Sequence, residues 1–375
     1  MIDEKIIKKV VDLRQKLHLS PEISGNEKET KKLLMEFIQN NSTCEIVDMG
    51  NFFYCIHKEE NANETIGFRA DFDAILNSEG VAFHGCGHDG HSAILCGLIL
   101  SLENVKTNKN IIFLFQHAEE NGTGAKECKE ILKPLNVSRF YGLHNYPNLN
   151  LNEVYTSYDT IMCASKGLTI DFEGTQSHAS EPENGNNPAY AIGKLIEDVK
   201  ELSSFQGYGT NYWKNIEFNS MILATIVNVS VGEKDAFGIS PGIGSISLTL
   251  RAKLSSDLDK LTKELLTLVD TYAKENNLKF NYKFTDEFPD TTNNKKEVER
   301  LKNILKNTNI KFNILKEPMR PSEDFGWYTK TVPCCFFFIG DGKHLPLHND
   351  EYTFPDEIIE RSIEVFNLIA TKKED

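Results

Sequence analysis

The chain has 375 residues, of which 40% are hydrophobic and 26% are charged. These proportions are ordinary for a globular protein, and the length suits two domains better than one. The formal net charge of −14 argues against nucleic acid or an anionic membrane as a partner.

The sequence shows neither a membrane segment nor a secretion signal. No run approaches the roughly 18 consecutive apolar residues of a membrane helix. The first residues, MIDEKIIKKVVD, mix charges with apolar positions, unlike a signal peptide. The eight cysteines lack the spacing of a disulfide scaffold, which fits reduced thiols. We therefore expect a cytoplasmic protein that does not bind membranes.

The first part of the sequence alternates helical and strand patterns. Apolar residues recur at helical spacing from Ile6 to Leu17, and Asn26 and Glu29 predict a capping box at the start of a second helix. Strands are expected at 44–49, 52–57, 65–71, 111–116 and 139–144, with a helix around 94–102. Strands that alternate with helices predict an α/β fold with a mostly parallel sheet and helices on both faces.

The pattern changes near residue 165. Strand and helix signals follow in the order β-α-β-β-α-β, at 167–174, 188–202, 217–229, 244–254, 257–276 and 279–284. This order is typical of the ferredoxin-like motif. A helix at 295–307, strands at 311–315 and 334–340, and a last helix with Ile358 to Ile369 resume the first pattern. We predict a catalytic domain in two segments, 1–164 and 288–375, and an inserted ferredoxin-like α+β lid domain at 165–287.

Two clusters of reactive side chains predict a metal site. Residues 84–91 read His-Gly-Cys-Gly-His-Asp-Gly-His, and residues 116–120 read Gln-His-Ala-Glu-Glu. Thiolate, imidazole and carboxylate groups together suit Zn²⁺ or a similar first-row metal. In proteins with a parallel sheet, substrates and cofactors bind beyond the carboxyl ends of the strands. Asp71, Glu119, Glu120 and His144 are expected to lie there. The clusters therefore indicate a metallohydrolase centre.

The motifs resemble those of the dinuclear metal aminoacylase and carboxypeptidase superfamily. The most similar branch is the amidohydrolases, which includes hippurate hydrolases, N-acetyl-diaminopimelate deacetylases, auxin-conjugate hydrolases and N-acyl-amino-acid deacylases. The resemblance runs end to end, through the segments LRQKLHLSPEIS (13–24), FRADFDA (68–74), FHGCGHDGH (83–91), FQHAEE (115–120), LHNYP (143–147), GTQSHAS (174–180), SEDFGWY (322–328) and LPLHNDEY (345–352).

The resemblance implies a role for each matching residue. The implied ligands of two divalent metal ions are Cys86, His88, Glu120, His144 and His348, with Cys86 as the bridging thiolate. Glu119 would be the general base, and Asp71 would orient a histidine ligand. His178 would reach an active site from the inserted domain, and Arg251 would bind the carboxylate of the substrate. Asp89 is not among these ligands. We expect it either to fix a histidine ring beside the metal ions, because metal-bound histidines usually donate their other N–H to a carboxylate, or to have a structural role.

The implied reaction is metal-dependent hydrolysis of the amide bond of N-acyl-amino acids by a metal-bridging hydroxide, with Glu119 as the base. The metals expected first are Zn²⁺ and Mn²⁺, and Co²⁺ or Ni²⁺ would suit the same ligands. A dipeptidase or carboxypeptidase of the same fold is the alternative, and a non-catalytic binding protein on this scaffold ranks far below. The expected partners are a small N-acyl-amino acid and a second copy of the chain, joined through the lid domain.

Overall fold

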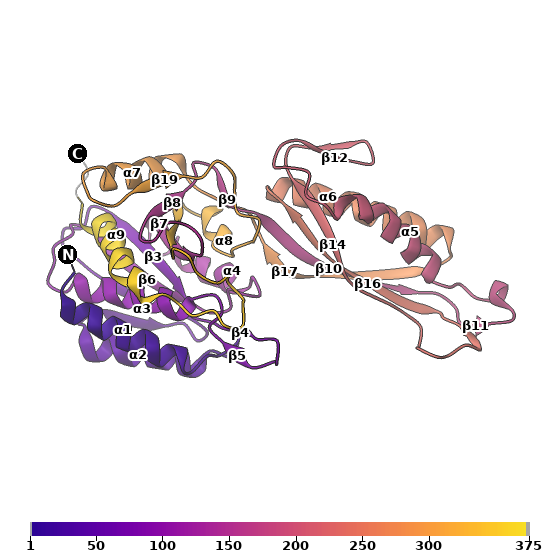
Figure 1. The fold of residues 1–375 in the computed structure, drawn as a ribbon, viewed down its shortest axis with the longest axis horizontal. Helices are drawn as coiled ribbons and strands as arrows, with labels where there is room; N and C mark the ends of the chain where they lie inside the picture. Colours follow the sequence, from indigo (N-terminus) through magenta and orange to yellow (C-terminus); the bar gives the residue numbers. More distant parts are fainter. Residues whose placement is uncertain (1, 373–375) are drawn as a thin grey trace. The chain divides into compact units, whose positions relative to one another are not determined.

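A computed structural model describes residues 2–372, which form two compact units (Figure 1). Unit 1 contains the residues up to Ile161, Thr291–Pro318 and the residues from Glu323 onward. Unit 2 contains Met162–Asp290 and Met319–Ser322. Sequence patterns do not assign the segment Met319–Ser322 to the inserted domain. It joins unit 2 through the backbone N–H of Cys163, which donates to the carbonyls of Met319 and Pro321 at 3.3 and 3.2 Å.

The core of unit 1 is an eight-stranded mixed sheet. In spatial order its strands are β1 (Glu45–Asp48), β2 (Phe53–His57), β6 (Asn110–Gln116), β3 (Thr65–Asp71), β7 (Val137–Tyr146), β20 (Cys334–Gly340), β8 (Val154–Thr156) and β19 (Phe312–Ile314). The four central strands, β6, β3, β7 and β20, run parallel, while β1, β2 and β8 introduce antiparallel pairs. The predicted mixed α/β class with a parallel centre is confirmed.

Helices cover both faces of this sheet. One face packs against α1 (Glu4–His18), α2 (Lys28–Asn41), α3 (His88–Ser101), α7 (Lys295–Leu305) and α9 (Ile359–Thr371). Helices α1 and α9, from opposite ends of the chain, lie side by side (Figure 1). The short helices α4 (Gly124–Cys128) and α8 (Gly326–Thr329) lie on the other face, where the Tyr328 hydroxyl donates to Gln116 Oε1 at 2.8 Å.

Side chains alternate along β3 and divide its two faces chemically. Ile66, Phe68 and Ala70 enter the apolar core beneath the long helices. Arg69 and Asp71 point to the opposite face, as the period of a strand requires. This face of the sheet is therefore polar at the carboxyl end of β3.

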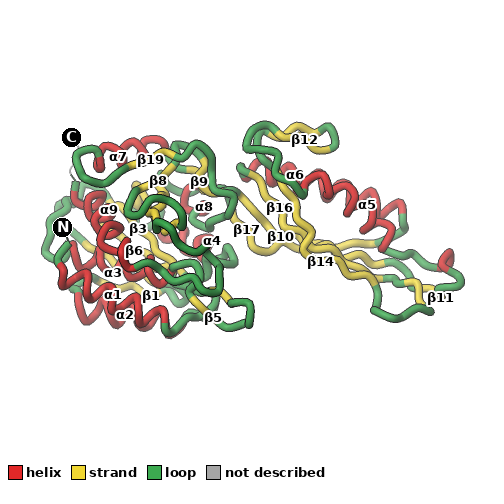
Figure 2. The backbone as a smooth tube through the Cα atoms, viewed as in Figure 1, coloured by secondary structure: helices red, strands yellow, loops and turns green. Residues whose placement is uncertain are grey.

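Unit 2 is a four-stranded antiparallel sheet with two helices along one face (Figure 2). Its strands, in spatial order, are β14 (Ile222–Val231), β16 (Ile243–Ala252), β10 (Ala164–Glu173) and β17 (Lys279–Phe288). Its helices are α5 (Ala189–Val199) and α6 (Ser255–Glu275). Leu168, Ile170, Leu195 and Leu261 lie in the core between the helices and the sheet.

Small elements complete both units. The short strands pair as β4 (Ile75–Leu76) with β5 (Ala82–Phe83), β9 (Thr160–Met162) with β18 (Thr291–Thr292), β11 (Ser177–His178) with β15 (Ile239–Ser240), and β12 (Asn211–Trp213) with β13 (Ile216–Phe218). Single-turn 3₁₀ helices occupy Lys129–Ile131, Pro182–Asn184, Lys200–Leu202 and Asp356–Ile358.

Two predicted details differ in the structure. The predicted strand at 217–229 is divided in the structure: β13 ends at Phe218 and β14 begins at Ile222. Between them, the N–H of Asn219 and the hydroxyl of Ser220 donate to Asp257 at 3.2 and 2.6 Å. The capping box of Asn26 and Glu29 is wrong: α2 begins at Lys28, and Glu22 accepts hydrogen bonds from the N–H and hydroxyl of Thr30 at 2.7 and 2.8 Å.

Within the described residues no helix combines the length and the apolar character needed to cross a bilayer. All eight cysteines are free thiols.

Candidate metal centre

The candidate metal centre lies at the carboxyl ends of the central strands of unit 1. Asp71 ends β3, Glu119 and Glu120 follow β6, and His144 lies near the end of β7. These three strands are neighbours in the sheet, in the order β6-β3-β7. His88 is the first residue of α3, which follows the loop that carries Cys86. The fold therefore brings side chains from distant parts of the sequence to one edge of the sheet.

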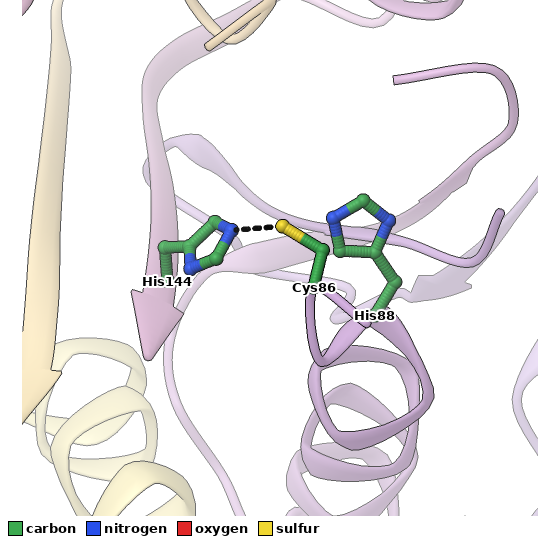
Figure 3. A group of neighbouring side chains, drawn as sticks. All are labelled: Cys86, His88 and His144. Carbon is green, nitrogen blue, oxygen red and sulfur yellow. Dashed lines mark hydrogen bonds between the residues drawn. The ribbon is translucent and has the colours of Figure 1, made fainter. Parts of the chain in front are cut away.

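Cys86 connects two groups of candidate ligands in this cluster. Its sulfur lies 3.5 Å from Nε2 of His144, and Figure 3 shows the Cys86 side chain between the rings of His144 and His88. The ligand atoms of these three residues all lie within 4.8 Å of one another. Within the same limit Cys86 also groups with Glu120 and His348. One sulfur atom thus belongs to two groups of candidate ligands.

His348 reaches the cluster from a loop with an unusual backbone. Its φ angle is 65°, in the left-handed region that residues with a side chain seldom adopt. Its N–H donates to the carbonyl of Gly85 at 2.8 Å, which ties this loop to the one that holds Cys86. The Nε2 atom lies 3.4 Å from Oε1 of Glu120, and the side chain is 53% exposed. His348 is the most exposed of the five predicted ligands.

The carboxylate that fixes the His88 ring is Asp73. Its Oδ1 lies 2.8 Å from Nδ1 of His88. A carboxylate can only accept, so Nδ1 carries a proton and Nε2 is the ring nitrogen left for a metal ion. The other oxygen of Asp73 accepts from the hydroxyl of Ser24 at 2.7 Å and from the N–H of Glu120 at 3.0 Å. Sequence reasoning missed Asp73, although it follows Asp71 at the spacing that places two side chains on one face.

Asp71 and Asp89 contact other partners. Asp71 Oδ1 lies 2.7 Å from Nδ1 of His91, and its Oδ2 is 3.7 Å from Nε2 of His88. Asp89 bonds Nδ1 of His18 at 2.8 Å, which agrees with the structural one of its two expected roles. Asp73, and not Asp89, occupies the position beside His88.

A buried ionic network lies next to Glu119. Arg69 donates to Asp71 at 2.7 Å, to Glu323 at 2.9 Å and to Asp324 at 2.8 Å. The backbone N–H of Asp324 donates to Oε1 of Glu119 at 3.1 Å. Sequence reasoning gave no role to Arg69, Glu323 or Asp324, and only the motifs FRADFDA and SEDFGWY point to them.

The electrostatic environment of Glu119 follows from its burial. The residue is only 6% exposed. Burial raises the pKa of its carboxyl group well above the ordinary range, and the nearby carboxylates of Glu323 and Glu120 add to the effect. A carboxylate in this place is held among other negative groups, which a divalent cation would offset.

The residues of the cluster fit a divalent metal ion. Among the described residues, the buried atoms His88 Nε2 and Glu120 Oε1 have no hydrogen-bond partner, and they lie 3.8 Å apart. Two ligand atoms on one tetrahedral Zn²⁺ are separated by about 3.3–3.8 Å, given metal–ligand lengths of about 2.0–2.3 Å. The observed separations of 3.5 Å between Cys86 and His144 and 3.4 Å between His348 and Glu120 agree with that spacing.

The Cys86 thiol supports the same conclusion. Burial raises its pKa well above the ordinary value, and the carboxylates of Glu120 and Glu119 raise it further. A bound metal ion reverses this effect, because it coordinates the thiolate form. The donor set of one thiolate, imidazoles and a carboxylate is the chemistry that Zn²⁺ and similar first-row ions prefer.

The remaining two predicted site residues belong to unit 2. His178 is exposed in the short strand β11, and its Nδ1 accepts from the N–H of Ser180 at 3.1 Å. Arg251 lies in β16, and its Nη1 donates to the carbonyl of Arg320 at 3.1 Å and to the hydroxyl of Ser322 at 2.9 Å. Both acceptors of Arg251 are uncharged.

Known proteins resemble this chain over nearly its full length. The hippurate hydrolase of Campylobacter jejuni is 27% identical over 96% of this chain and 95% of its own length. The N-acetyldiaminopimelate deacetylase of Lactococcus lactis is 26% identical over 95% of this chain and 96% of its own. A Bacillus subtilis structure described as a dinuclear metal binding peptidase shares the fold, with a TM-score of 0.79 and 20% identity over 98% of each chain. The sequence profile of peptidase family M20/M25/M40 matches residues 59–372, and the chain belongs to this family.

Proposed function

We propose that the protein hydrolyses the amide bond of N-acyl-amino acids in a metal-dependent reaction. The observation that carries this proposal is the sulfur of Cys86, which belongs to two groups of candidate ligands beside Glu119 and Glu120. The hydrolase and the deacetylase that the chain resembles are named for substrates of this class. Hippurate is an N-acylated amino acid, as is N-acetyldiaminopimelate.

Five side chains would hold the metal ions. One group consists of Cys86, His88 and His144, and the other consists of Cys86, Glu120 and His348. Cys86 would bridge the two ions, because its sulfur is common to both groups. Two divalent cations held there would lower the pKa of water and polarise the scissile carbonyl. Zn²⁺ or Mn²⁺ is proposed first, and the donor set also suits Co²⁺ and Ni²⁺.

Glu119 would move the proton. It takes a proton from the attacking water and returns it to the amine as the carbon–nitrogen bond breaks, so the products are a carboxylic acid and an amino acid. The N–H of Asp324 fixes one oxygen of Glu119, which aims the carboxylate. Asp73 keeps His88 in the tautomer that presents Nε2. Asp71 would act through the His91 ring.

We propose that unit 2 is the predicted lid and that His178 and Arg251 bind substrate. The chain enters unit 2 at Met162 and leaves it at Asp290, between two segments of unit 1. The positive charge of Arg251 is not neutralised by its two uncharged acceptors, so it remains suited to a carboxylate. A carboxylate next to the amide is what an N-acyl-amino acid offers.

We also propose that the protein is a homodimer joined through unit 2. Strand β14 lies at an edge of its sheet, and Ile226, Val227 and Val229 are 37%, 64% and 42% exposed. The strand has no charged residue along Ile222–Val231, whereas the opposite edge strand, β17, carries lysines and acidic residues. Edge strands without protecting charges pair readily with another chain. A second copy of β14 would extend the sheet.

A substrate panel tests the function. The protein, loaded in turn with Zn²⁺, Mn²⁺, Co²⁺ or Ni²⁺, is assayed on N-acetyl-, N-benzoyl- and indole-acyl-amino acids and on dipeptides, with its metal content measured by elemental analysis. We expect hydrolysis of N-acyl-amino acids by protein with about two ions per chain. Faster turnover of dipeptides would favour the dipeptidase alternative. Metal binding without any turnover would favour a binding protein.

A further inference from the structure

The turn that carries Glu119 has a strained backbone. Ala118 precedes Glu119 and Glu120, and its φ angle is 49°. This left-handed conformation is unfavourable for a residue with a Cβ atom. Ala118 is also buried, at 1% exposure, so water does not satisfy its backbone groups. The turn therefore needs partners elsewhere in the fold to hold it.

Its main long-range partner is Glu27. The N–H of Ala118 donates to Oε1 of Glu27 at 2.8 Å, across 91 residues of sequence. Glu27 is 6% exposed and lies directly before helix α2. Two residues further along, the backbone N–H of Glu120 donates to the carboxylate of Asp73 at 3.0 Å. Glu119 lies between these two fixed points.

The Glu27 carboxylate does not cap helix α2, the helix that begins after it. The first turn of α2 receives its side-chain cap from Glu22, which accepts from the N–H and the hydroxyl of Thr30. The structure records no side-chain capping bond from Glu27 to α2. The carboxylate instead points to the Ala118 turn, on a different element.

We propose that Glu27 is a positioning residue, which holds the strained turn at Ala118 and thereby aims Glu119 at the reacting water. The inference rests on the proposed function of Glu119 as the base. It requires only that residue 27 supply a hydrogen-bond acceptor to the Ala118 N–H. A small displacement of a catalytic group can cost a large factor in rate even when binding is intact.

Three variants separate this role from a structural one. Glu27→Ala removes the acceptor, and we expect kcat to fall about tenfold to a hundredfold while KM stays within about twofold. Glu27→Gln keeps a carbonyl acceptor and should restore kcat to within about threefold of wild type. Glu22→Ala removes two bonds from the same helix start without touching the turn, so its kcat should match wild type.

Amide hydrogen exchange gives a readout that does not depend on turnover. In metal-free protein, Glu27→Ala should speed exchange of the amides of residues 118–124 about tenfold or more, and Glu27→Gln and Glu22→Ala should not. If Glu27→Ala fails to fold, the comparison is made in an Ala118→Gly background, where glycine relieves the strain. There too, the Glu27→Ala change should lower kcat about tenfold, because the looser turn still needs its anchor.

Two outcomes overturn the proposal. One is a Glu27→Ala variant with wild-type kcat or wild-type exchange at residues 118–124. The other is a Glu27→Gln variant that loses as much kcat as Glu27→Ala, which would make the charge and not the acceptor essential. A wild-type protein that hydrolyses none of the substrate panel refutes the proposed function instead, and the exchange data then decide whether Glu27 holds the turn.

Discussion

Oδ1 of Asp73 lies 2.8 Å from Nδ1 of His88, and this contact determines which nitrogen of the ring faces the metal cluster. The protonated Nδ1 is committed to Asp73, so Nε2 is left as the ligand atom. That atom is buried and, within residues 2–372, has no hydrogen-bond partner. The pair shows how a residue outside the ligand set prepares the site for a cation.

Asp73→Asn should weaken metal binding. The Asn side chain presents a donor or a weaker acceptor to His88, so the ring loses its fixed tautomer, and we expect a loss of about 10- to 100-fold in metal affinity. The measurement is a titration of metal-free protein against a competing chelator. Ser24→Ala is the matched control, because it removes a bond to the same carboxylate but leaves the His88 contact. Equal affinities in wild type and Asp73→Asn would contradict the assignment.

Substitution of Glu119 should impair the chemical step, whereas substitution of Glu120 should impair metal binding. Glu119→Gln should keep the metal ions and lower kcat by about 10² or more, since Gln cannot accept the proton. Glu120→Gln should lose metal affinity first, because Glu120 groups with Cys86 and His348. Metal content and kcat are measured on both variants. The division of labour fails if both variants retain their metal and hydrolyse substrate at wild-type rates.

Metal removal should destabilise unit 1. An ion that binds only the folded state, at a free concentration one hundred times its dissociation constant, stabilises that state by about 2.7 kcal/mol. Chelation should therefore lower Tm, measured by calorimetry with and without chelator. Cys86→Ala is the control, since the shared sulfur is gone and chelation should change its Tm little. A wild-type Tm that does not respond to verified metal loss would argue against the site.

Val229→Lys should dissociate the proposed dimer. Val229 is 42% exposed on the edge strand β14, and a charge there opposes pairing with a second β14. The molar mass from light scattering should fall from that of a dimer to the 42.5 kDa of one chain. Lys283→Gln on the opposite edge strand, β17, is the control and should leave the mass unchanged. A Val229→Lys protein that remains dimeric places the interface elsewhere.

Much of the fold follows from patterns that are local in the sequence. The apolar run at 111–116 predicts β6, and the recurrence of Ile363, Phe366 and Ile369 predicts α9. The two metal motifs are also local, which is why Cys86, His88, Glu119 and Glu120 could be chosen from sequence. Their position at one edge of the sheet could also be predicted, because sites in parallel sheets form beyond the carboxyl ends of the strands.

The contacts that complete the site are not local and could not be predicted. Asp73, rather than Asp89, bonds His88, because the turn after β3 directs Asp73 to the start of α3. Glu27 reaches Ala118 across 91 residues. No spacing rule relates Glu27 to Ala118, since only the folded chain brings the residue before α2 to the turn after β6.

The last prediction concerns the stability of the protein as a function of pH. Burial raises the pKa of Glu27 from 4.5 to about 7, and the nearby carboxylate of Asp73 raises it further. Hydrogen bonds from the backbone amides of Glu27 itself, Ala118 and Gly25 oppose this shift. Between these two pKa values the folded state binds more protons than the unfolded state. Stability is therefore lost as the pH rises from about 4.5 through about 7.

Glu27→Gln removes this titration and keeps a carbonyl for the Ala118 N–H. We compare the free energy of unfolding of Glu27→Gln with that of wild type at each pH. The difference, variant minus wild type, should increase between pH 5 and pH 8 by at most about 3 kcal/mol, since one pKa unit corresponds to about 1.4 kcal/mol. Urea denaturation of metal-free protein at both pH values measures the difference without a contribution from metal binding. At pH 5 wild-type Glu27 is mostly protonated in the folded state, so the two proteins should then differ least. A difference that is the same at both pH values would show that Glu27 does not carry the raised pKa.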